Sequence, residues 1–214
     1  MATLLKRIIA IYSLLLLCFS LPVQGAEPCS KVPADWKLES QQTVGVLCAD
    51  VLIQPGIEGV RKLRVFDSGK PAFESDAAAL CQNCGGARGD PFQGIKWNGQ
   101  ILSVDNEGGS RESWVETWKI GKREQGWVII GWDRHILDHL TMDMWSESVN
   151  ALTGKATSQY QPGEPSCDVD PARCKNPASL KPRGNSCAIK QKSPPISQLT
   201  KLREQHFACG LKMP

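Results

Sequence analysis

Alternation of apolar and polar residues is the feature that most constrains this fold. Apolar residues recur on one strand face in runs such as RKLRVFD (61–67) and ESWVETWKI (112–120). A period of two puts alternate side chains on opposite faces of a strand. We expect strands at 43–53, 61–67, 99–105, 112–120 and 127–133, turns at 98–99 and 121–126, and a hairpin over 147–160 with Gly154 in its turn. The predicted fold is mainly β, an antiparallel β-meander or sandwich of about five to seven strands.

The N-terminal segment has the pattern of a signal peptide. Lys6 and Arg7 precede the 12-residue apolar run from Ile8 to Phe19, and LPVQGA follows. Removal of residues 1–25, after Gly25, fits the preference for small residues at the cleavage site. A membrane-spanning helix needs about 20 apolar residues, so this run predicts export and no membrane span after its removal. The expected location is periplasmic or secreted.

The cysteine count predicts a disulfide-bonded protein. The chain has 9 cysteines, and removal of Cys18 with the signal peptide leaves eight. An even number of cysteines in an exported chain favours disulfides. The sequence does not determine which cysteines pair. The disulfide candidates are Cys29, Cys48, Cys81, Cys84, Cys167, Cys174, Cys187 and Cys209.

Composition divides the exported chain into a β-rich domain, 26–160, and a basic, cysteine-containing extension, 161–214. Residues 26–150 hold 13 basic and 18 acidic residues, whereas residues 151–214 hold 10 basic and 4 acidic residues. A basic surface attracts anionic polymers or acidic protein faces, although a solvated linker has the same composition. We expect a protein or an anionic envelope polymer as partner, and no nucleic acid. The predicted partner-binding residues are Lys175, Lys181, Arg183, Lys190 and Lys192.

Two helical segments are expected in the extension, which is predicted to be disulfide-rich and partly helical. Asp170 and Pro171 are suited to the N-cap and first position of a single helical turn between Cys167 and Cys174. Gly210 is the predicted stop of a second helix. The apolar face of that helix is predicted at Ile196, Leu199, Leu202 and His206.

The stretch LCQNCGGARGDPFQGI (80–95) admits four interpretations. A zinc site would need a second ligand pair, such as Cys167 with Cys174 or His135 with His139, and neither completes a familiar pattern. A reactive dithiol is favoured at a helix N-terminus, which the following glycines disfavour. A phosphate loop would need a Lys-Ser/Thr pair that is missing here. A turn closed by a disulfide remains, with Cys81 or Cys84 bonded to each other or to a distant cysteine such as Cys48.

Two further residue pairs could carry chemistry. His135 and His139 would share a face on a helix but are polar rim residues on a loop, which we favour. Glu112 and Glu116 would lie on one strand face, either as an acid and base pair or, as we expect, as surface carboxylates. Six of the 7 tryptophans lie between Trp97 and Trp145, as in a packed β core or an aromatic ligand groove. No catalytic residue, metal site or cofactor is predicted.

The blocks CGGARGDPFQGI, NGQILSVDNEGGSRESWVETWKI, GWVIIGWD and ESVNALTGK occur in this order. In these blocks the chain resembles an uncharacterised family of exported bacterial β-rich proteins, over about residues 81–155. The resemblance implies an exported β-rich domain and brings no activity with it. The segment RESWVE and the basic extension depart from the family pattern.

These features together predict an exported, non-enzymatic binding protein of the bacterial envelope. An inhibitor or immunity protein against a periplasmic toxin or lytic enzyme is one form that this role would take. The alternative is a periplasmic enzyme, either a redox protein that uses Cys81 and Cys84 or a cell-wall hydrolase that uses carboxylates.

Overall fold

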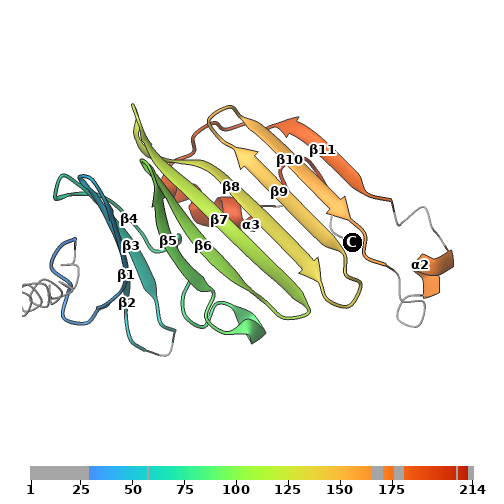
Figure 1. Cartoon of the computed structure of the whole chain (residues 1–214), viewed down its shortest axis with the longest axis horizontal. Coiled ribbons are helices and arrows are strands. Elements are labelled where there is room, and N and C mark those ends of the chain that lie inside the picture. Colours follow the sequence, from blue (N-terminus) through green and yellow to red (C-terminus); the bar gives the residue numbers. More distant parts are fainter. Residues whose placement is uncertain (1–28, 57, 165–170, 176–180, 206, 212–214) are drawn as a thin grey trace, which may run out of the picture.

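The computed structural model of the chain describes residues 29–56, 58–164, 171–175, 181–205 and 207–211. The predicted signal peptide, Cys167, Asp170 and His206 lie outside this part. The described strands form two antiparallel sheets (Figure 1), one of 4 and one of 7 strands. The mainly β fold class is therefore confirmed, although the expected meander is divided between two sheets.

The smaller sheet contains the first four strands in chain order. They are β1 (Lys37–Val44), β2 (Leu47–Ile53), β3 (Arg61–Asp67) and β4 (Lys70–Ser75). The single strand predicted over 43–53 is wrong, because Gly45 and Val46 form a turn between β1 and β2. Gly45 has φ of 57°, a left-handed conformation that glycine adopts without steric cost.

The larger sheet has the order β11-β10-β9-β8-β7-β6-β5, so chain neighbours are also spatial neighbours. Its strands are β5 (Phe92–Asn98), β6 (Ile101–Gly109), β7 (Glu112–Arg123), β8 (Gly126–Asp138), β9 (Met144–Asn150), β10 (Lys155–Gln161) and β11 (Arg183–Ala188). The hairpin predicted over 147–160 is confirmed, and the turn predicted over 121–126 is shorter because β7 and β8 extend into it.

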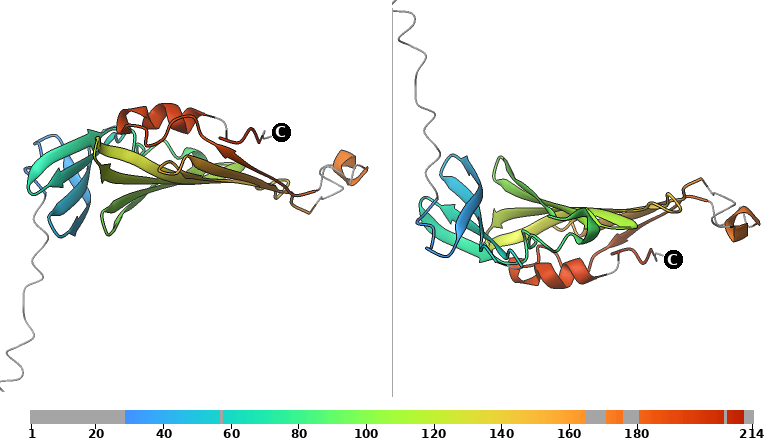
Figure 2. Two further views of the ribbon diagram at one scale, coloured as in Figure 1. Left: turned by 90° about the horizontal axis from the view of Figure 1, so that it is seen from above. Right: turned by 90° about the horizontal axis from the view of Figure 1, so that it is seen from below.

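The basic C-terminal part contributes to the same fold. After the short α2 (Pro171–Lys175), β11 joins the large sheet, and η4 (Ile196–Gln198) leads into α3 (Leu199–Glu204). Figure 2 shows α3 lying across one face of the large sheet. The apolar face predicted for this helix is buried at Ile196, Leu199 and Leu202, but the helix ends before Gly210.

One hydrophobic core joins both sheets and α3. Val51 and Leu63 of the small sheet are fully buried in the same cluster as Val104 and Trp118 of the large sheet and Leu199 of α3. A second, smaller cluster contains Trp145, Tyr160, Phe207 and Leu211. Packing against β5 and β6 through this core explains why the small sheet lies beside that end of the large sheet (Figure 1).

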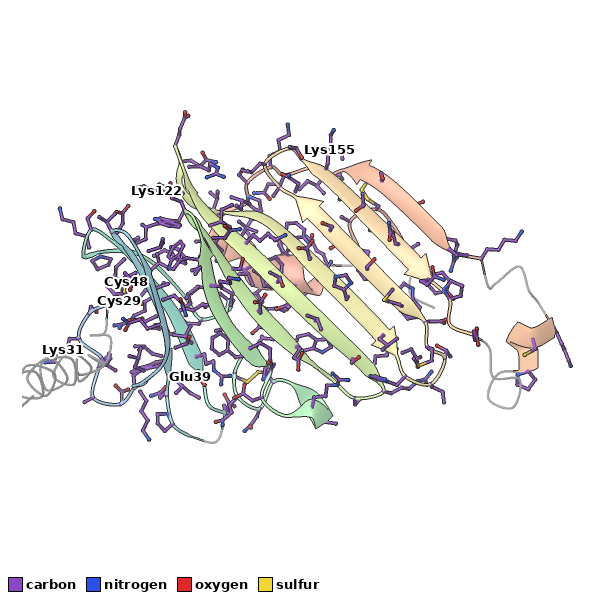
Figure 3. All side chains as sticks on the ribbon, viewed as in Figure 1. Cys29, Lys31, Glu39, Cys48, Lys122 and Lys155 are labelled. Atoms are coloured by element: carbon purple, nitrogen blue, oxygen red, sulfur yellow. A yellow bond between two sulfur atoms is a disulfide. The ribbon has the colours of Figure 1, made fainter. Side chains whose placement is uncertain are left out.

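Three disulfides are described. Cys29 is bonded to Cys48 in β2 (Figure 3), and Cys187 in β11 is bonded to Cys209 after α3. The third, Cys81–Cys84, closes a short loop. Cys174 is also disulfide-bonded. Within the described ranges no helix has the length and apolar character to cross a membrane. Disulfides fit a protein of an extracellular or periplasmic compartment.

Candidate functional site

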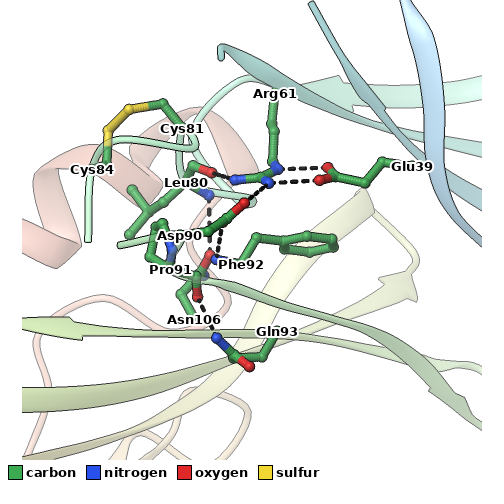
Figure 4. A network of polar contacts seen from close by, with 10 residues as sticks. All are labelled: Glu39, Arg61, Leu80, Cys81, Cys84, Asp90, Pro91, Phe92, Gln93 and Asn106. Atoms are coloured by element: carbon green, nitrogen blue, oxygen red, sulfur yellow. Dashed lines mark hydrogen bonds and ion pairs between the residues drawn. A yellow bond between two sulfur atoms is a disulfide. The ribbon is translucent and has the colours of Figure 1, made fainter. Parts of the chain in front are cut away.

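Arg61 of β3 fixes both ends of the loop that carries the CxxC sequence (Figure 4). Its side chain is 1% exposed and donates hydrogen bonds to the Leu80 carbonyl at 2.7 Å, to the Asp90 carboxylate at 2.6 Å and to both carboxylate oxygens of Glu39. Burial lowers the pKa of Arg61, but its hydrogen bonds to Glu39 and Asp90 outweigh burial and hold that pKa above its ordinary value. The guanidinium therefore stays charged and joins the loop to both β1 and β3.

The two cysteines of this loop are bonded to each other. Their Cα atoms are 5.1 Å apart, and the Cys84 amide donates to the Cys81 carbonyl at 3.0 Å. The disulfide between them rules out pairing of either residue with a distant cysteine, and Cys48 is bonded to Cys29 instead. The Cys81–Cys84 bond matches the turn closed by a disulfide. A reactive dithiol in its oxidised form would have the same bond, so that interpretation stays a prediction.

Gly85 gives the loop its close packing. A Cβ at this position would lie 2.0 Å from the Gly89 carbonyl oxygen, which leaves no room for any side chain. The Gly85 carbonyl accepts from the Gly109 amide at 2.8 Å, so the loop is bonded to the end of β6. The Asp90 carboxylate accepts a hydrogen bond from the Phe92 amide at 3.1 Å, which closes a turn, and Ile95 is buried.

A pocket of about 540 Å³ opens between this loop, the large sheet and the segment after α3. Apolar walls come from Leu80, Trp114, Ile136 and Phe207, and Cys84 lies at the loop side. A volume of this size holds a small molecule or one or two large side chains of a partner. Trp114 belongs to the cluster of tryptophans noted in the sequence, whereas Trp118, Trp132 and Trp145 are core residues.

Charged side chains at the base of the pocket are paired. Glu116 is 4% exposed and accepts three hydrogen bonds from Arg203 of α3, the shortest at 2.5 Å. Asn106 also donates to Glu116 at 3.2 Å. The expectation that Glu116 is a surface carboxylate is therefore wrong. Glu112 is exposed and lies four residues, about 13 Å, along the same strand, too far away for the two to act as a catalytic pair.

A second ion pair holds the segment after α3 against the sheet. Arg134 of β8 pairs with the buried Glu147 of β9 at 2.7 Å and donates to the carbonyls of Arg203 and Gln205. The other oxygen of Glu147 accepts from the Ala208 amide. The wall of the pocket that includes Phe207 is thus fixed by hydrogen bonds from two strands.

The two histidines singled out in the sequence do not form a metal site. His135 lies within β8, not in a loop, and lines the pocket, whereas His139 follows the strand. The His139 ring is 2.9 Å from the Ser113 hydroxyl and 3.2 Å from an Arg88 nitrogen. Among the described residues no group of His, Cys, Asp and Glu is arranged to hold a metal ion.

Asp138 organises the turn at the end of β8. It is 5% exposed, pairs with Arg111 at 2.8 Å and accepts from the Leu140 amide at 2.8 Å. The hydrogen bond from Arg111 and those from the backbone lower the pKa of Asp138 below its ordinary value, against the opposing effect of burial. The carboxylate is ionised near neutral pH and belongs to the turn, away from the pocket.

The predicted partner-binding residues surround β11 without lining the pocket. Lys181 and Arg183 lie at its start, Lys190 and Lys192 follow its end, and Lys175 is the last residue of α2. All five are exposed. The Arg183 guanidinium lies over the Tyr160 ring, 4.7 Å from its centroid. Their role stays a prediction.

Comparisons with known proteins give no relative for this chain: no family model, curated protein or solved structure matches it. The site is therefore defined by its own geometry. Sequence reasoning missed the pocket, Arg61, Arg134 and Arg203. One signal in the sequence could have indicated these arginines. Each is an arginine within an apolar strand or helix, where a charge is rarely buried without a partner of opposite charge.

Proposed function

We propose that this is an exported, non-enzymatic binding protein of the bacterial envelope. Its partner is a protein that inserts an apolar side chain into the pocket between the CxxC loop and the segment after α3. An inhibitor or immunity protein that occupies a periplasmic toxin or lytic enzyme would act in this way. The predicted signal peptide and the disulfides support the compartment.

One observation carries the proposal: the pocket wall is mainly apolar, and both arginines in its lining form ion pairs with buried carboxylates. Glu116 is bonded to Arg203 and Glu147 to Arg134, so neither carboxylate is free to transfer a proton. Cys84 is held in a disulfide. Half-buried apolar walls such as Trp114 are instead the type of surface that supplies binding energy in protein interfaces.

The test is capture from an envelope extract of the source bacterium by the purified mature chain, followed by reconstitution with the purified partner. We expect a stoichiometric complex that Trp114→Ala weakens about 30-fold, the effect of losing an interface hot spot. Val46→Ser is the matched control, because Val46 is 66% exposed on the β1–β2 turn. Equal affinity of wild type and Trp114→Ala, with both variants folded, would refute the pocket as the binding site.

A redox function is the second candidate, and one observation favours it: Cys81 and Cys84 are bonded to each other with Cys84 exposed at the pocket. In such a reaction a partner thiolate attacks the Cys84 sulfur and Cys81 leaves as a thiolate. A second partner thiol then displaces Cys84, so the partner dithiol is oxidised and this disulfide is reduced.

Titration with glutathione buffers followed by peptide mapping separates the two functions. Reduction of Cys81–Cys84 well before Cys29–Cys48, with dithiol oxidation lost in Cys84→Ser, would establish the redox function. We expect all three described disulfides to resist reduction together, because Arg61 fixes both ends of the CxxC loop.

A further inference from the structure

The outer edge of the large sheet is formed by β11, the last strand in the sheet order. The Ile189 amide donates to the Gly154 carbonyl at 2.9 Å, and the register places these residues opposite each other. Hydrogen-bonded pairs alternate along an antiparallel ladder, so Arg183, Asn185 and Cys187 bond to β10. The N–H and C=O groups of Gly184, Ser186 and Ala188 therefore point outward, and no described strand pairs with them.

Residues 184–188 of this edge strand lack the charged side chains and proline that usually prevent strand addition. The outward residues of β11 are small and uncharged, and the strand contains no proline. The corresponding edge of the small sheet is different, because β4 has Pro71, which lacks an N–H, next to Lys70. Proline and charged residues on an edge strand block pairing with another chain. A free edge with small side chains is a template for an additional strand.

The charge around β11 specifies the kind of strand that fits. Residues 181–203 include six Lys or Arg and no Asp or Glu. Lys181 and Arg183 lie at one end of the strand and Lys190 just beyond the other, and Lys155 of the adjacent β10 adds a further cation (Figure 3). An acidic segment is attracted along the whole edge. A second copy of β11 would bring cations opposite cations, which disfavours self-pairing.

A hollow lies beside this edge on the face that carries the segment after α3. It has a volume of about 470 Å³ and is lined by Arg183, Gly184, Asn185, Gly210 and Leu211. Its far wall is tied to the strand by the Cys187–Cys209 disulfide and by the hydrogen bond from Asn185 to the Cys209 carbonyl. Side chains of an added strand alternate between faces, so a side chain that passes residues 183–185 on this face would enter the hollow.

We propose that β11 binds an acidic protein segment in extended conformation, which adds to the large sheet as an eighth strand. This proposal rests on the proposed function in one respect, which is that the partner is a protein. It assigns a surface distinct from the pocket. Backbone hydrogen bonds to Gly184, Ser186 and Ala188 give affinity, and Arg183 and Lys190 select negative charge at the two ends of the segment.

The test uses a short synthetic peptide of alternating glutamate and valine, titrated into the isotope-labelled mature chain and followed by amide NMR shifts. We expect shifts centred on β11 and its neighbour β10. Ser186→Pro removes an outward N–H that β10 does not use, and should weaken binding at least ~10-fold while the protein stays folded. The peptide methylated at alternate amide nitrogens should lose binding to the same extent.

Charge is tested separately. Arg183→Glu with Lys190→Glu should weaken binding of the acidic peptide ~10-fold or more, whereas Lys96→Glu on the far strand β5 is the control and should change it less than ~2-fold. Undiminished binding of the methylated peptide would overturn strand addition, and so would the absence of any shift on β11. Concentration-dependent dimers abolished by Ser186→Pro would show that a second copy occupies the edge instead.

These outcomes are distinguishable from failure of the pocket proposal. Trp114→Ala leaves the β11 edge intact, so it should bind the acidic peptide as wild type does. Ser186→Pro likewise leaves the pocket unchanged. A protein that binds the peptide but captures no partner through Trp114 would retain this inference and refute the proposed function.

Discussion

Replacing Arg61 with methionine removes the cation that joins β3, β1 and both ends of the CxxC loop. Methionine keeps the aliphatic volume but leaves the carboxylates of Glu39 and Asp90 facing each other and the Leu80 carbonyl without its donor. Breaking a buried ion pair by removing one partner costs about 3–5 kcal/mol. The carboxylates are 27% and 38% exposed, so water compensates in part and about 3 kcal/mol is the expected loss of unfolding free energy.

Urea denaturation of oxidised protein, followed by tryptophan fluorescence, measures this loss. A slope of about 1–3 kcal/mol/M converts it into a midpoint lower by roughly 1–3 M. Lys62→Met is the matched control, since Lys62 is the next residue of β3 and its ion pair with Glu74 is long and exposed, at 3.6 Å. The control should lose at most about 1 kcal/mol. Equal stability of both variants would refute the claim that Arg61 stabilises the fold by holding both ends of the CxxC loop.

Three further predictions follow from the same geometry. Gly85→Ala should destabilise the fold by about 1–3 kcal/mol in urea melts, because its Cβ would collide with a backbone carbonyl; wild-type stability would contradict the close packing. Glu116→Gln should cost about 3 kcal/mol by leaving the Arg203 charge uncompensated, and Glu112→Gln less than about 0.5 kcal/mol; equal costs would contradict the assigned burial. Asp138 has a lowered pKa in the folded state, so its stabilising contribution is present above the pKa of the unfolded chain, about 3.9, and is lost as the pH falls through the folded value. The stability difference between wild type and Asp138→Asn should therefore shrink between pH 5 and pH 3 in chemical denaturation, and a difference independent of pH would contradict it.

Strands were predictable from sequence where local signals are unambiguous. The run 61–67 became β3 with the expected bounds, and the turn at Gly154 joins β9 and β10. The turn at Gly45 was missed because a single glycine within an apolar run has no turn partner such as Asn. The division into two sheets depends on which faces pack together, and hydrophobic periodicity does not encode that choice.

The candidate site was less predictable than the fold. Its pocket is assembled from the loop near Leu80, strand residues such as Trp114, and Phe207, which are far apart in the chain. The burial of Glu116 depends on Arg203, 87 residues away, so no local pattern distinguishes it from the exposed Glu112. By contrast, the apolar spacing at Leu199 and Leu202 correctly indicated a helix packed on the core.

The proposal that the pocket receives a protein partner is tested most directly by site-specific photo-crosslinking in cells of the organism that produces this chain. A benzophenone amino acid replaces Glu204, which is exposed at the rim of the pocket. The control position is Glu124, in the β7–β8 turn, about 26 Å along the strand from Glu116. We expect one discrete crosslinked protein from position 204 and none from position 124. No adduct at either position, or the same adducts at both, would contradict the account.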